Sequence, residues 1–498
     1  MPLNFKFSLT VPSATVASVV LASCTALYIW RVRYTRSKKR LPHPPGPSGF
    51  PLIGNLLDVP KEPSWVAYLA MSEKYDSDII RLNVMGTNFI VLNSAQAVTD
   101  LLEKRSSNYS DRSRMVMINE LVDYGWATTF LRYNTLWKDH RRAFHQYLGP
   151  ETSKHFRSIE ENSTVVLLGK LLRHSEGFTE HLRHMAGSTI LRIAYGIEVQ
   201  EQNDPFMYIS ERSTEAASAT INPGSYMVDM LPFLKYVPEW VPGAGFKKQA
   251  REWKHWVTEA CHIPYNIVKH QMEQGVAVDC VGTSIIENMV KNAPDAEYAE
   301  SAARGTLGSM YVAGVDTVVS TIRSFILAVV LQPDIQKKAQ AEIDLHCSGR
   351  LPTFADYDDL QYCHALVKEA LRWHPIVPLA VPHQSSSDDF YKGYYIPKGS
   401  IVVPNSWAIL RDETAYQEPH VFNPDRFLKD GKINPHVLDP ETAAFGYGRR
   451  ICPGQYLAYE SIWLAIASIL AVFNFAKAKD AEGNEITPSG EFTAGFMS

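Results

Sequence analysis

The stretch FGYGRRICPG, from Phe445 to Gly454, places Cys452 among three glycines and two arginines, directly before a proline and a long apolar run. Glycines allow a backbone to approach a flat ligand closely, and Arg450 can neutralise a carboxylate of such a ligand. Proline favours the first position of a helix, so Pro453 predicts a helix start with Cys452 at or next to its N-cap. The positive end of a helix favours a thiolate there. The alternative is a small buried free cysteine before a core helix.

The bulk composition is that of a globular protein. The chain has 498 residues, of which 45% are hydrophobic and 20% charged. The net charge of -4 gives no reason to expect a nucleic-acid partner. The six cysteines are scattered and form no C-x-x-C pair. This pattern predicts neither a disulfide framework nor a structural zinc site.

The N-terminus predicts a membrane anchor. Residues 7–30 carry no charge, and a bilayer span needs about 20 apolar residues. Residues 31–40, RVRYTRSKKR, are strongly basic, which places the rest of the chain on the cytosolic side by the positive-inside rule. A cleaved signal peptide is the alternative, because Lys6 precedes the apolar run. The proline-rich residues that follow cannot continue a helix and predict a stiff spacer.

The domain organisation follows from these segments. We expect a membrane anchor over 1–30, a basic flank and proline-rich hinge over 31–51, and one large catalytic domain over 52–498. Length alone suggests about three domains, but no linker or internal repeat divides the last segment. Helical periodicity dominates it, with short strand-like runs, so the expected class is mainly α with small β-sheets (α+β). The expected helices cover 301–331, 335–345, 360–373 and 455–473, and the expected strands lie within 79–86, 88–93 and 388–407.

The cysteine loop resembles a known signature. Its pattern F-x-x-G-x-R-x-C-x-G is filled by Phe445, Gly448, Arg450, Cys452 and Gly454 and is similar to the heme-binding motif of the cytochrome P-450 family. The resemblance implies the P-450 fold, with Cys452 as the axial ligand of the iron of heme b. It also implies that Phe445, Gly448 and Arg450 bind the cofactor.

Two further segments bear on cofactor binding. In WKDHRR, Trp137 and Arg141 lie one helical turn apart and match the family's W-x-x-x-R. The resemblance implies that both, together with Arg450, hold the heme propionates through charge-assisted hydrogen bonds. His383, in PLAVPH, is another cofactor-binding candidate, and its alternative is an ordinary satisfied surface histidine.

The segment KEALRW predicts a structural ion pair. Glu369 and Arg372 are three residues apart on an expected helix and therefore share a face. An ordinary surface pair is the alternative. The resemblance implies instead a buried network with Arg426 of FNPDRF, where Asp425 stands in place of the family's more usual glutamate. These residues are expected to brace the heme-side core and to take no part in the chemistry.

The segment AGVDT places polar groups in the middle of an apolar helix. Gly314 permits close helix packing, and the Thr317 hydroxyl can bond back to a carbonyl one turn earlier. The resemblance implies a catalytic role as well: Thr317 orients dioxygen and water, and Asp316 supplies protons.

The implied activity is that of a heme-thiolate monooxygenase, which inserts one atom of dioxygen into a hydrophobic small molecule. The chain carries no glycine-rich dinucleotide fingerprint. The resemblance therefore implies electrons from NADPH through a separate NADPH-cytochrome P-450 reductase, which docks near Lys138, Arg142 and Arg449, although these three are equally typical of a solvated surface. The alternatives are a heme-thiolate isomerase, dehydratase or peroxygenase that works without reductase, and a non-catalytic heme protein or scaffold.

The expected substrate follows from the resemblance and from the composition of the pocket segments. By resemblance the pocket is lined by Met115–Trp126, Thr214–Val241, the PLAVP segment from Pro378 and Phe492–Phe496. These apolar segments predict a bulky apolar substrate. The sequence most resembles fungal members, so a terpenoid is the first candidate, ahead of polyketides or indole alkaloids.

The expected location is the endoplasmic reticulum membrane, spanned once, with the catalytic domain facing the cytosol. The glycosylation motifs at Asn108 and Asn162 would then stay unmodified. Family members usually extend further beyond a segment such as FTAGFMS, which predicts an abbreviated last strand.

Overall fold

The computed structural model describes residues 18, 22, 23, 25, 26, 28, 41–60, 63–221, 225–291, 293–490 and 492. Apart from those six isolated positions, the predicted anchor and basic flank lie outside the described residues, as does most of the predicted turn at 492–496. The chain forms two compact units, one of residues 1–44 with 388–396 and one of residues 45–387 with 397–498. In the first unit, β4 (Asp389–Tyr391) and β5 (Tyr394–Ile396) form an antiparallel hairpin. The Tyr395 amide donates to the Pro42 carbonyl over 2.8 Å.

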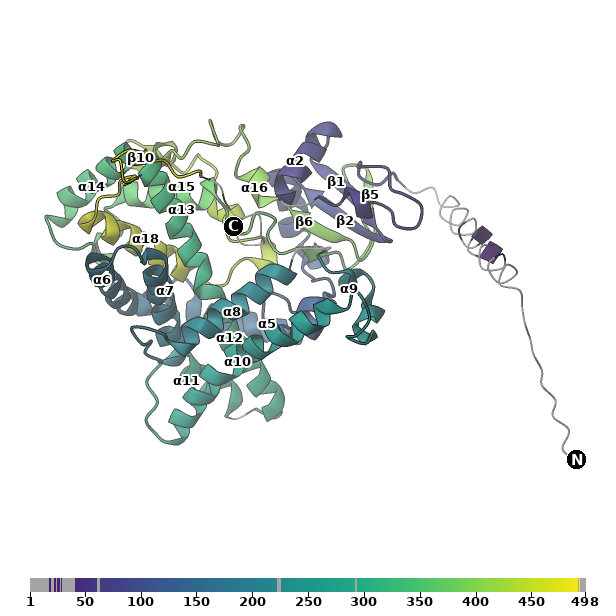
Figure 1. Cartoon of the computed structure of the whole chain (residues 1–498), viewed down its shortest axis with the longest axis horizontal. Coiled ribbons are helices and arrows are strands. Elements are labelled where there is room, and N and C mark those ends of the chain that lie inside the picture. Colours follow the sequence, from purple (N-terminus) through teal and green to yellow (C-terminus); the bar gives the residue numbers. More distant parts are fainter. Residues whose placement is uncertain are drawn as a thin grey trace, which may run out of the picture. The chain divides into compact units, whose positions relative to one another are not determined.

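Helices make up most of the second unit, which confirms the predicted class (Figure 1). Its α-helices are α2 (Ser64–Lys74), α3 (Ala95–Val98), α4 (Ser106–Tyr109), α5 (Thr135–Leu148), α6 (Arg157–Arg173), α7 (Phe178–Tyr195), α8 (Pro205–Thr220), α9 (Met227–Met230), α10 (Gly245–Glu273), α11 (Val281–Ile285), α12 (Ala296–Gly314), α13 (Asp316–Leu331), α14 (Pro333–Cys347), α15 (Gln361–Trp373), α16 (Ser406–Ile409), α17 (Glu441–Ala444) and α18 (Gln455–Val472). Short 3-10 or π segments are η1 (Leu56–Asp58), η2 (Thr99–Lys104), η3 (Met117–Leu121), η4 (Ser153–Phe156), η5 (Pro232–Tyr236), η6 (Ile286–Val290), η7 (Phe354–Asp356), η8 (Pro424–Phe427) and η9 (Gly448–Arg450).

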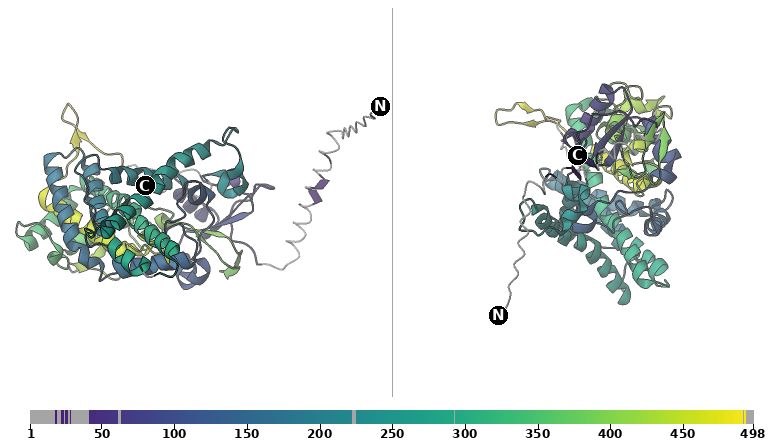
Figure 2. Two further views of the ribbon diagram at one scale, coloured as in Figure 1. Left: turned by 90° about the horizontal axis from the view of Figure 1, so that it is seen from below. Right: turned by 90° about the vertical axis from the view of Figure 1, so that its right-hand side faces the viewer.

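A four-stranded sheet lies at one end of this unit, in the order β1-β2-β6-β3. β1 (Ile79–Val84) pairs antiparallel with β2 (Thr87–Leu92), β2 pairs parallel with β6 (Ile401–Pro404), and β6 pairs antiparallel with β3 (His383–Gln384). The short strands β7 (Leu428–Lys429) and β8 (Lys432–Ile433) form a separate pair. β9 (Ala478–Lys479) and β10 (Glu485–Ile486) form a hairpin that projects from the helical body (Figure 2).

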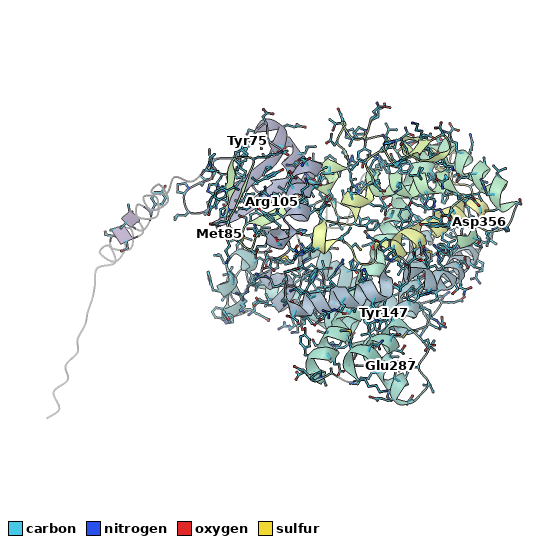
Figure 3. The ribbon with its side chains drawn as sticks, turned by 180° about the vertical axis from the view of Figure 1, so that it is seen from behind. Tyr75, Met85, Arg105, Tyr147, Glu287 and Asp356 are labelled. Carbon is cyan, nitrogen blue, oxygen red and sulfur yellow. The ribbon has the colours of Figure 1, made fainter. Side chains whose placement is uncertain are left out.

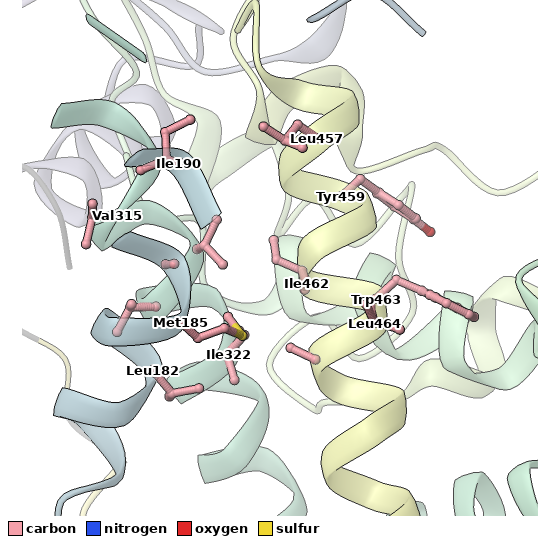
Figure 4. Close-up of a cluster of buried hydrophobic side chains, with 14 of the residues drawn as sticks. Leu182, Met185, Ile190, Val315, Ile322, Leu457, Tyr459, Ile462, Trp463 and Leu464 are labelled. Carbon is pink, nitrogen blue, oxygen red and sulfur yellow. The ribbon is translucent and has the colours of Figure 1, made fainter. Parts of the chain in front are cut away.

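The helix that follows the cysteine loop forms the centre of the helical part. α18 is continuous because its sequence contains no glycine or proline, and it packs against α6, α13, α14 and α15. Leu457 and Ile462 of α18 face Met185 and Ile322 across one buried cluster (Figure 4). α18 and the run 296–331 are long and apolar enough to cross a membrane, but 67% and 50% of their most apolar windows are buried in the protein, as expected for core helices.

The predicted helix over 301–331 is wrong in one respect, because it is two helices. α12 ends at Gly314, and α13 begins at Asp316. A Cβ on Gly314 would lie 2.9 Å from Ile190 Cγ1, so α7 packs directly against the interruption. Local periodicity does not register such a contact between distant segments.

The two ends of the second unit differ in character (Figure 3). Tyr75 and Met85 mark the end that carries the sheet, and Asp356 marks the opposite, helical end. Tyr147 of α5 and Glu287 of η6 lie along the edge between them, where the Asn288 amide donates to the Tyr147 hydroxyl over 3.1 Å.

Candidate active site

A cavity of about 360 Å³ lies where the cysteine loop meets α5, α7, α8 and the junction of α12 and α13. This volume falls in the usual range of small-molecule sites, about 300–1,000 Å³. The fold brings most of the candidate residues predicted from sequence to its wall: Trp137, Arg141, Asp316, Thr317, His383, Phe445, Arg450 and Cys452. Gly448 shapes the loop from outside the cavity, and Glu369, Arg372 and Arg426 lie elsewhere.

The cysteine loop has a backbone that only glycine permits at two points. Gly446 and Gly448 have φ of +80° and +55°, and a Cβ on Gly448 would lie 2.1 Å from the Leu102 carbonyl oxygen. The Cys452 amide donates to the Phe445 carbonyl over 2.7 Å and closes the loop. α18 begins at Gln455 with Gly454 as N-cap, so Cys452 lies two residues before the N-cap, one position further out than predicted, and Pro453 is not the first helical residue.

The electrostatics of the thiol also differ from the expectation. Burial raises the pKa of Cys452 above its ordinary value, against the lowering effects of the Gly454 amide and of Arg141. The protein alone therefore favours the thiol. A metal cation bound to sulfur removes the proton outright, so the site suits a thiolate only when it is coordinated.

Arg450 is the best-placed cation in the cavity wall. Its Nε donates to the Ser110 carbonyl over 2.7 Å and its Nη2 to the Leu131 carbonyl over 2.9 Å, while its guanidinium stacks 4.4 Å above the Trp137 ring. Burial lowers its pKa to about 10, so it remains charged at neutral pH. Its Nη1 is buried and has no hydrogen-bond partner among the described residues. This nitrogen is available to an anion.

Three other basic side chains lie beside it. Arg141 Nη1 donates to the Ile451 carbonyl over 2.7 Å. The His383 Nδ1 lies 2.6 Å from the Tyr109 carbonyl, which can only accept, so Nδ1 carries the proton. His383 is buried and lines the cavity, which excludes the surface alternative. Burial, and then Arg112, lower its pKa.

Arg112 was missed from the sequence. It is 3% exposed, lines the cavity, and donates to the carbonyls of Thr129, Val381 and Pro382. Burial depresses its pKa, and so does its neighbour Arg450. A single arginine in a loop carries no local pattern, so only the fold identifies it.

Asp316 and Thr317 lie at the start of α13. Thr317 Oγ1 donates to the Ala313 carbonyl over 2.8 Å, the back-bonding expected from sequence. Asp316 Oδ1 accepts from Arg183 Nε over 3.3 Å, and Arg183 also pairs with Glu211 at 3.0 Å. Glu211 is half exposed, at 51% of its side chain, so a line of charged groups connects Asp316 with the surface.

The Glu369 network lies behind the site. Arg372 donates from Nε and Nη2 to the two carboxylate oxygens over 2.7 and 2.8 Å, and both side chains are 0% exposed. Arg426 Nε lies 3.2 Å from the same carboxylate. The remaining Arg372 donors bind the carbonyls of Leu410, Pro419 and Val421. The network thus fixes the irregular chain between α16 and η8, and the surface-pair alternative is wrong for Glu369 and Arg372.

The predicted pocket segments contribute unequally. Tyr124, Thr214, Ala217 and Ile221 line the cavity, as do Ala380 and Val381 of the PLAVP segment and Val377 just before it. Phe492 stacks on His374, which lines the cavity. The wall contributed by α6 and α7, including Glu160 and Met185, was not predicted.

The predicted surface residues have their own contacts. Lys138 and Arg449 each lie within 5.5 Å of the centre of the Tyr133 ring, and Arg142 pairs with Asp139 at 2.7 Å. All three are exposed. Asn108 accepts from the amides of Ser386 and Ser387 through its side chain.

The donor set fits heme. A cysteine thiolate is the type of ligand that heme iron takes in enzymes that cleave dioxygen, and the unpartnered Arg450 Nη1 suits a propionate. The cavity wall is otherwise largely apolar, with side chains such as Phe144, Leu148, Ile190, Val377 and Leu457. No group of three or more histidine, cysteine or acidic side chains suited to a metal occurs in the described part of the chain. An iron held at Cys452 therefore needs ligands from a macrocycle.

Comparison with known proteins agrees with this geometry. A family model described as Cytochrome P450 matches residues 44–494. A cytochrome P450 monooxygenase of Armillaria gallica is 41% identical over 98% of this chain and 95% of its own length. The tryptamine 4-monooxygenase of Psilocybe cyanescens is 40% identical, over 97% of this chain and 95% of its own length. A third relative, a cytochrome P450 monooxygenase of Coprinopsis cinerea, is 39% identical over 98% of this chain and 93% of its own length.

Proposed function

Because the chain belongs to the cytochrome P450 family and is a P450 monooxygenase, we propose that it oxidises a neutral, bulky apolar molecule. A terpenoid is the first candidate substrate. The electrons come from NADPH and are delivered by a separate reductase. The observation that carries the proposal is the cavity wall, where several hydroxyl groups already bond to the protein and Arg450 Nη1 is assigned to a heme propionate. The remainder of the wall is apolar, which supports a substrate bound by shape and burial.

Three hydroxyl groups of the wall are occupied, whereas the Thr214 hydroxyl has no hydrogen-bond partner among the described residues. Thr189 donates to the Met185 carbonyl, Thr321 to the Thr317 carbonyl and Ser309 to the Gly305 carbonyl. The hydrogen of each of these hydroxyl groups is therefore already used and is not available to a substrate. A substrate rich in hydroxyl groups would find few free partners here.

The acidic groups of the wall are also compensated. Asp316 is paired with Arg183, and burial raises the pKa of Glu160 well above its usual value, which favours the neutral form of that carboxyl. Among the described lining residues, no carboxylate is left to attract an ammonium group. This distinguishes the expected substrate from tryptamine, the amine in the name of one relative.

The cofactor is heme b, and we assign its contacts to the residues that surround the cavity. Cys452 supplies the axial sulfur, and Phe445 and Gly448 shape the loop that carries it. Arg450, Arg141, Trp137 and His383 hold the propionates, with Arg112 as an addition that only the fold suggested. A thiolate-bound heme supplies dioxygen activation and O–O cleavage when bound.

Protons and electrons reach the site from different sides. Arg183 keeps its proton and holds the Asp316 carboxylate in place, and we assign proton delivery into the cavity to Asp316 and the neighbouring Thr317 hydroxyl. Lys138, Arg142 and Arg449 offer exposed positive charge for the acidic face of a reductase. The two pathways separate the redox partner from the substrate pocket.

The sequence of the N-terminal segment supports a membrane location. Residues 1–30 serve as a single anchor in the endoplasmic reticulum, residues 31–51 as the cytosolic flank and hinge, and residues 52–498 as the catalytic domain. The apolar run and the basic block that follows support this arrangement. Both Asn108 and Asn162 should remain free of glycan.

The test is a reconstitution of membranes that contain the full chain with an NADPH-dependent reductase. Reduced membranes with carbon monoxide should give the strongly red-shifted Soret band of thiolate ligation, which Cys452→Ala abolishes. A neutral sesquiterpene hydrocarbon should then gain oxygen only with reductase and NADPH, while tryptamine should neither shift the Soret band nor be oxidised. Oxidation of tryptamine with no turnover of neutral terpenes would refute the substrate assignment.

A further inference from the structure

The loop between η3 and α5 rests directly on α12 at a point where α12 has no side chain. A Cβ on Gly305 would lie 2.8 Å from His140 Cε1 and 2.9 Å from the Trp126 carbonyl oxygen. Contacts this short exclude any larger residue. The loop, the helix α5 that carries His140, and α12 therefore meet in one place.

Three side chains join these elements through hydrogen bonds whose direction is determined. Ser309 Oγ donates to the Gly305 carbonyl over 2.6 Å, so it accepts the bonds from the Thr128 amide at 2.9 Å and from the Thr128 hydroxyl at 3.1 Å. Thr128 Oγ1 has then given its hydrogen away. It must accept from His140 Nδ1, which lies 2.9 Å from it.

This order fixes the state of His140. Its Nδ1 carries the hydrogen, and its Nε2 is a buried acceptor with no partner among the described residues. Burial lowers the pKa of His140 to about 4, so the ring is neutral at physiological pH. Burying an imidazole whose Nε2 accepts no hydrogen bond costs free energy, so an apolar side chain would fill this space better. We therefore attribute the presence of a histidine here to its hydrogen bond to Thr128.

The loop is also held at its other end. The Tyr124 hydroxyl donates to the Ser213 carbonyl of α8 over 2.8 Å. Tyr124, Thr128 and Ser309 all line the cavity, while His140 stands behind the wall. The loop is thus fixed between α8 on one side and α5 with α12 on the other, and its depth sets the shape of the substrate space.

We propose that His140, Thr128 and Ser309 are positioning residues that fix the depth of this loop in the cavity and thereby determine which substrates fit. The inference rests on the proposed function, because it concerns the same pocket. None of the three contacts the reacting atoms. They act through the position of the wall.

The first test measures the loop itself, without turnover. Hydrogen–deuterium exchange of the full chain, followed by mass spectrometry of the peptide that contains Thr128, reports on the amide that Ser309 holds. Thr128→Val and Ser309→Ala should each speed this exchange about tenfold, the equivalent of one lost hydrogen bond. Two matched controls should leave it unchanged: Thr306→Val on the same helix, whose hydroxyl only back-bonds to Ala302, and Ser324→Ala, which back-bonds to Ser320.

The second test measures selectivity with two probes. Imidazole and 4-phenylimidazole both bind heme iron and shift the Soret band, but only the larger one reaches the wall. Thr128→Val and Ser309→Ala should weaken 4-phenylimidazole relative to imidazole by about fivefold or more, within the range of one lost positioning contact. His140→Asn should retain the wild-type ratio because its amide nitrogen takes the place of Nδ1, whereas His140→Gln should not.

The outcomes separate the two proposals. Unchanged exchange and an unchanged probe ratio in Thr128→Val and Ser309→Ala would overturn the positioning role. Equal effects in the control variants, or rescue by His140→Gln instead of His140→Asn, would do the same. Absence of any Soret shift in the wild-type protein would refute heme binding, while the exchange experiment would still decide the role of the loop.

Discussion

Removal of the charge of Glu369 should destabilise the protein by several kilocalories per mole. Glu369 accepts two bonds from Arg372, one from the Asn423 amide at 2.7 Å and one from Arg426. Glu369→Gln preserves the shape of the side chain but leaves the guanidinium of Arg372, 0% exposed, without a counter-charge. The amide nitrogen of the new glutamine is itself a donor, and it would face an N–H group that now donates to Glu369.

The magnitude follows from the burial of the pair. Breaking a buried ion pair by removing one partner costs about 3–5 kcal/mol, because the remaining charge stays desolvated. With an unfolding entropy of about 2.1 cal/mol/K per residue over about 450 residues, each kcal/mol lowers Tm by about 1 °C. We therefore expect a Tm about 3–5 °C lower, by the same scaling.

The assay is thermal unfolding of the heme-loaded protein, followed by the loss of the carbon monoxide Soret band. The control is Lys338→Ala, which breaks the exposed ion pair with Asp425, next to Arg426 in sequence. An exposed pair contributes about 0–1 kcal/mol, so its Tm should hardly move. A Glu369→Gln protein with the Tm of the control would contradict the buried-network argument.

Three other perturbations test the site. Cys452→Ser should retain the fold by circular dichroism but lose the red-shifted carbon monoxide band, and a retained band would exclude Cys452 as the ligand. Asp316→Asn should leave the Kd for substrate unchanged while product formation falls about 10²-fold, the usual contribution of a general acid; an unchanged product-to-NADPH ratio would argue against a proton path through Asp316. The pKa of His140 is about 4 in the folded protein and about 6.5 in the unfolded chain, and Asp139 acts to raise the folded value. The contribution of His140 to the free energy of unfolding is therefore complete above pH 6.5. It decreases by about 3 kcal/mol in total as the pH falls toward 4. The free energy of unfolding should therefore fall more between pH 7 and pH 4.5 in the wild-type protein than in His140→Asn. An equal fall in the two proteins would contradict this.

Helices with long apolar periodicity were predictable to within a few residues. The predicted ranges 360–373 and 455–473 match α15 and α18, because each segment is a long run of helix-forming residues without glycine or proline. The break at Val315 was not predicted, because it depends on the contacts of Gly314 with α7 and of Asp316 with Arg183. Those partners lie more than a hundred residues away in sequence.

The site shows the same division. Residues in compact motifs, such as Trp137 and Cys452, could be selected from sequence, and the fold places them on one cavity. Arg112 and His140 have no motif of their own, and their significance depends on partners supplied by distant segments. The raised pKa of the thiol was missed for a related reason: a helix start was visible in the sequence, but the burial that opposes it was not.

The interruption at Val315 separates α12 from α13, so the two helices can change independently during evolution. Both helices contact α7 and both contribute to the cavity wall, but α12 also contacts α5, α8 and α10, whereas α13 also contacts α14, α15 and α18, the helix that follows the cysteine loop. Because the two helices do not share a continuous hydrogen-bond ladder, replacements along α12 can reshape the pocket with little displacement of α13. A lineage that diversifies its products can therefore vary one half of this long segment and keep the other nearly constant.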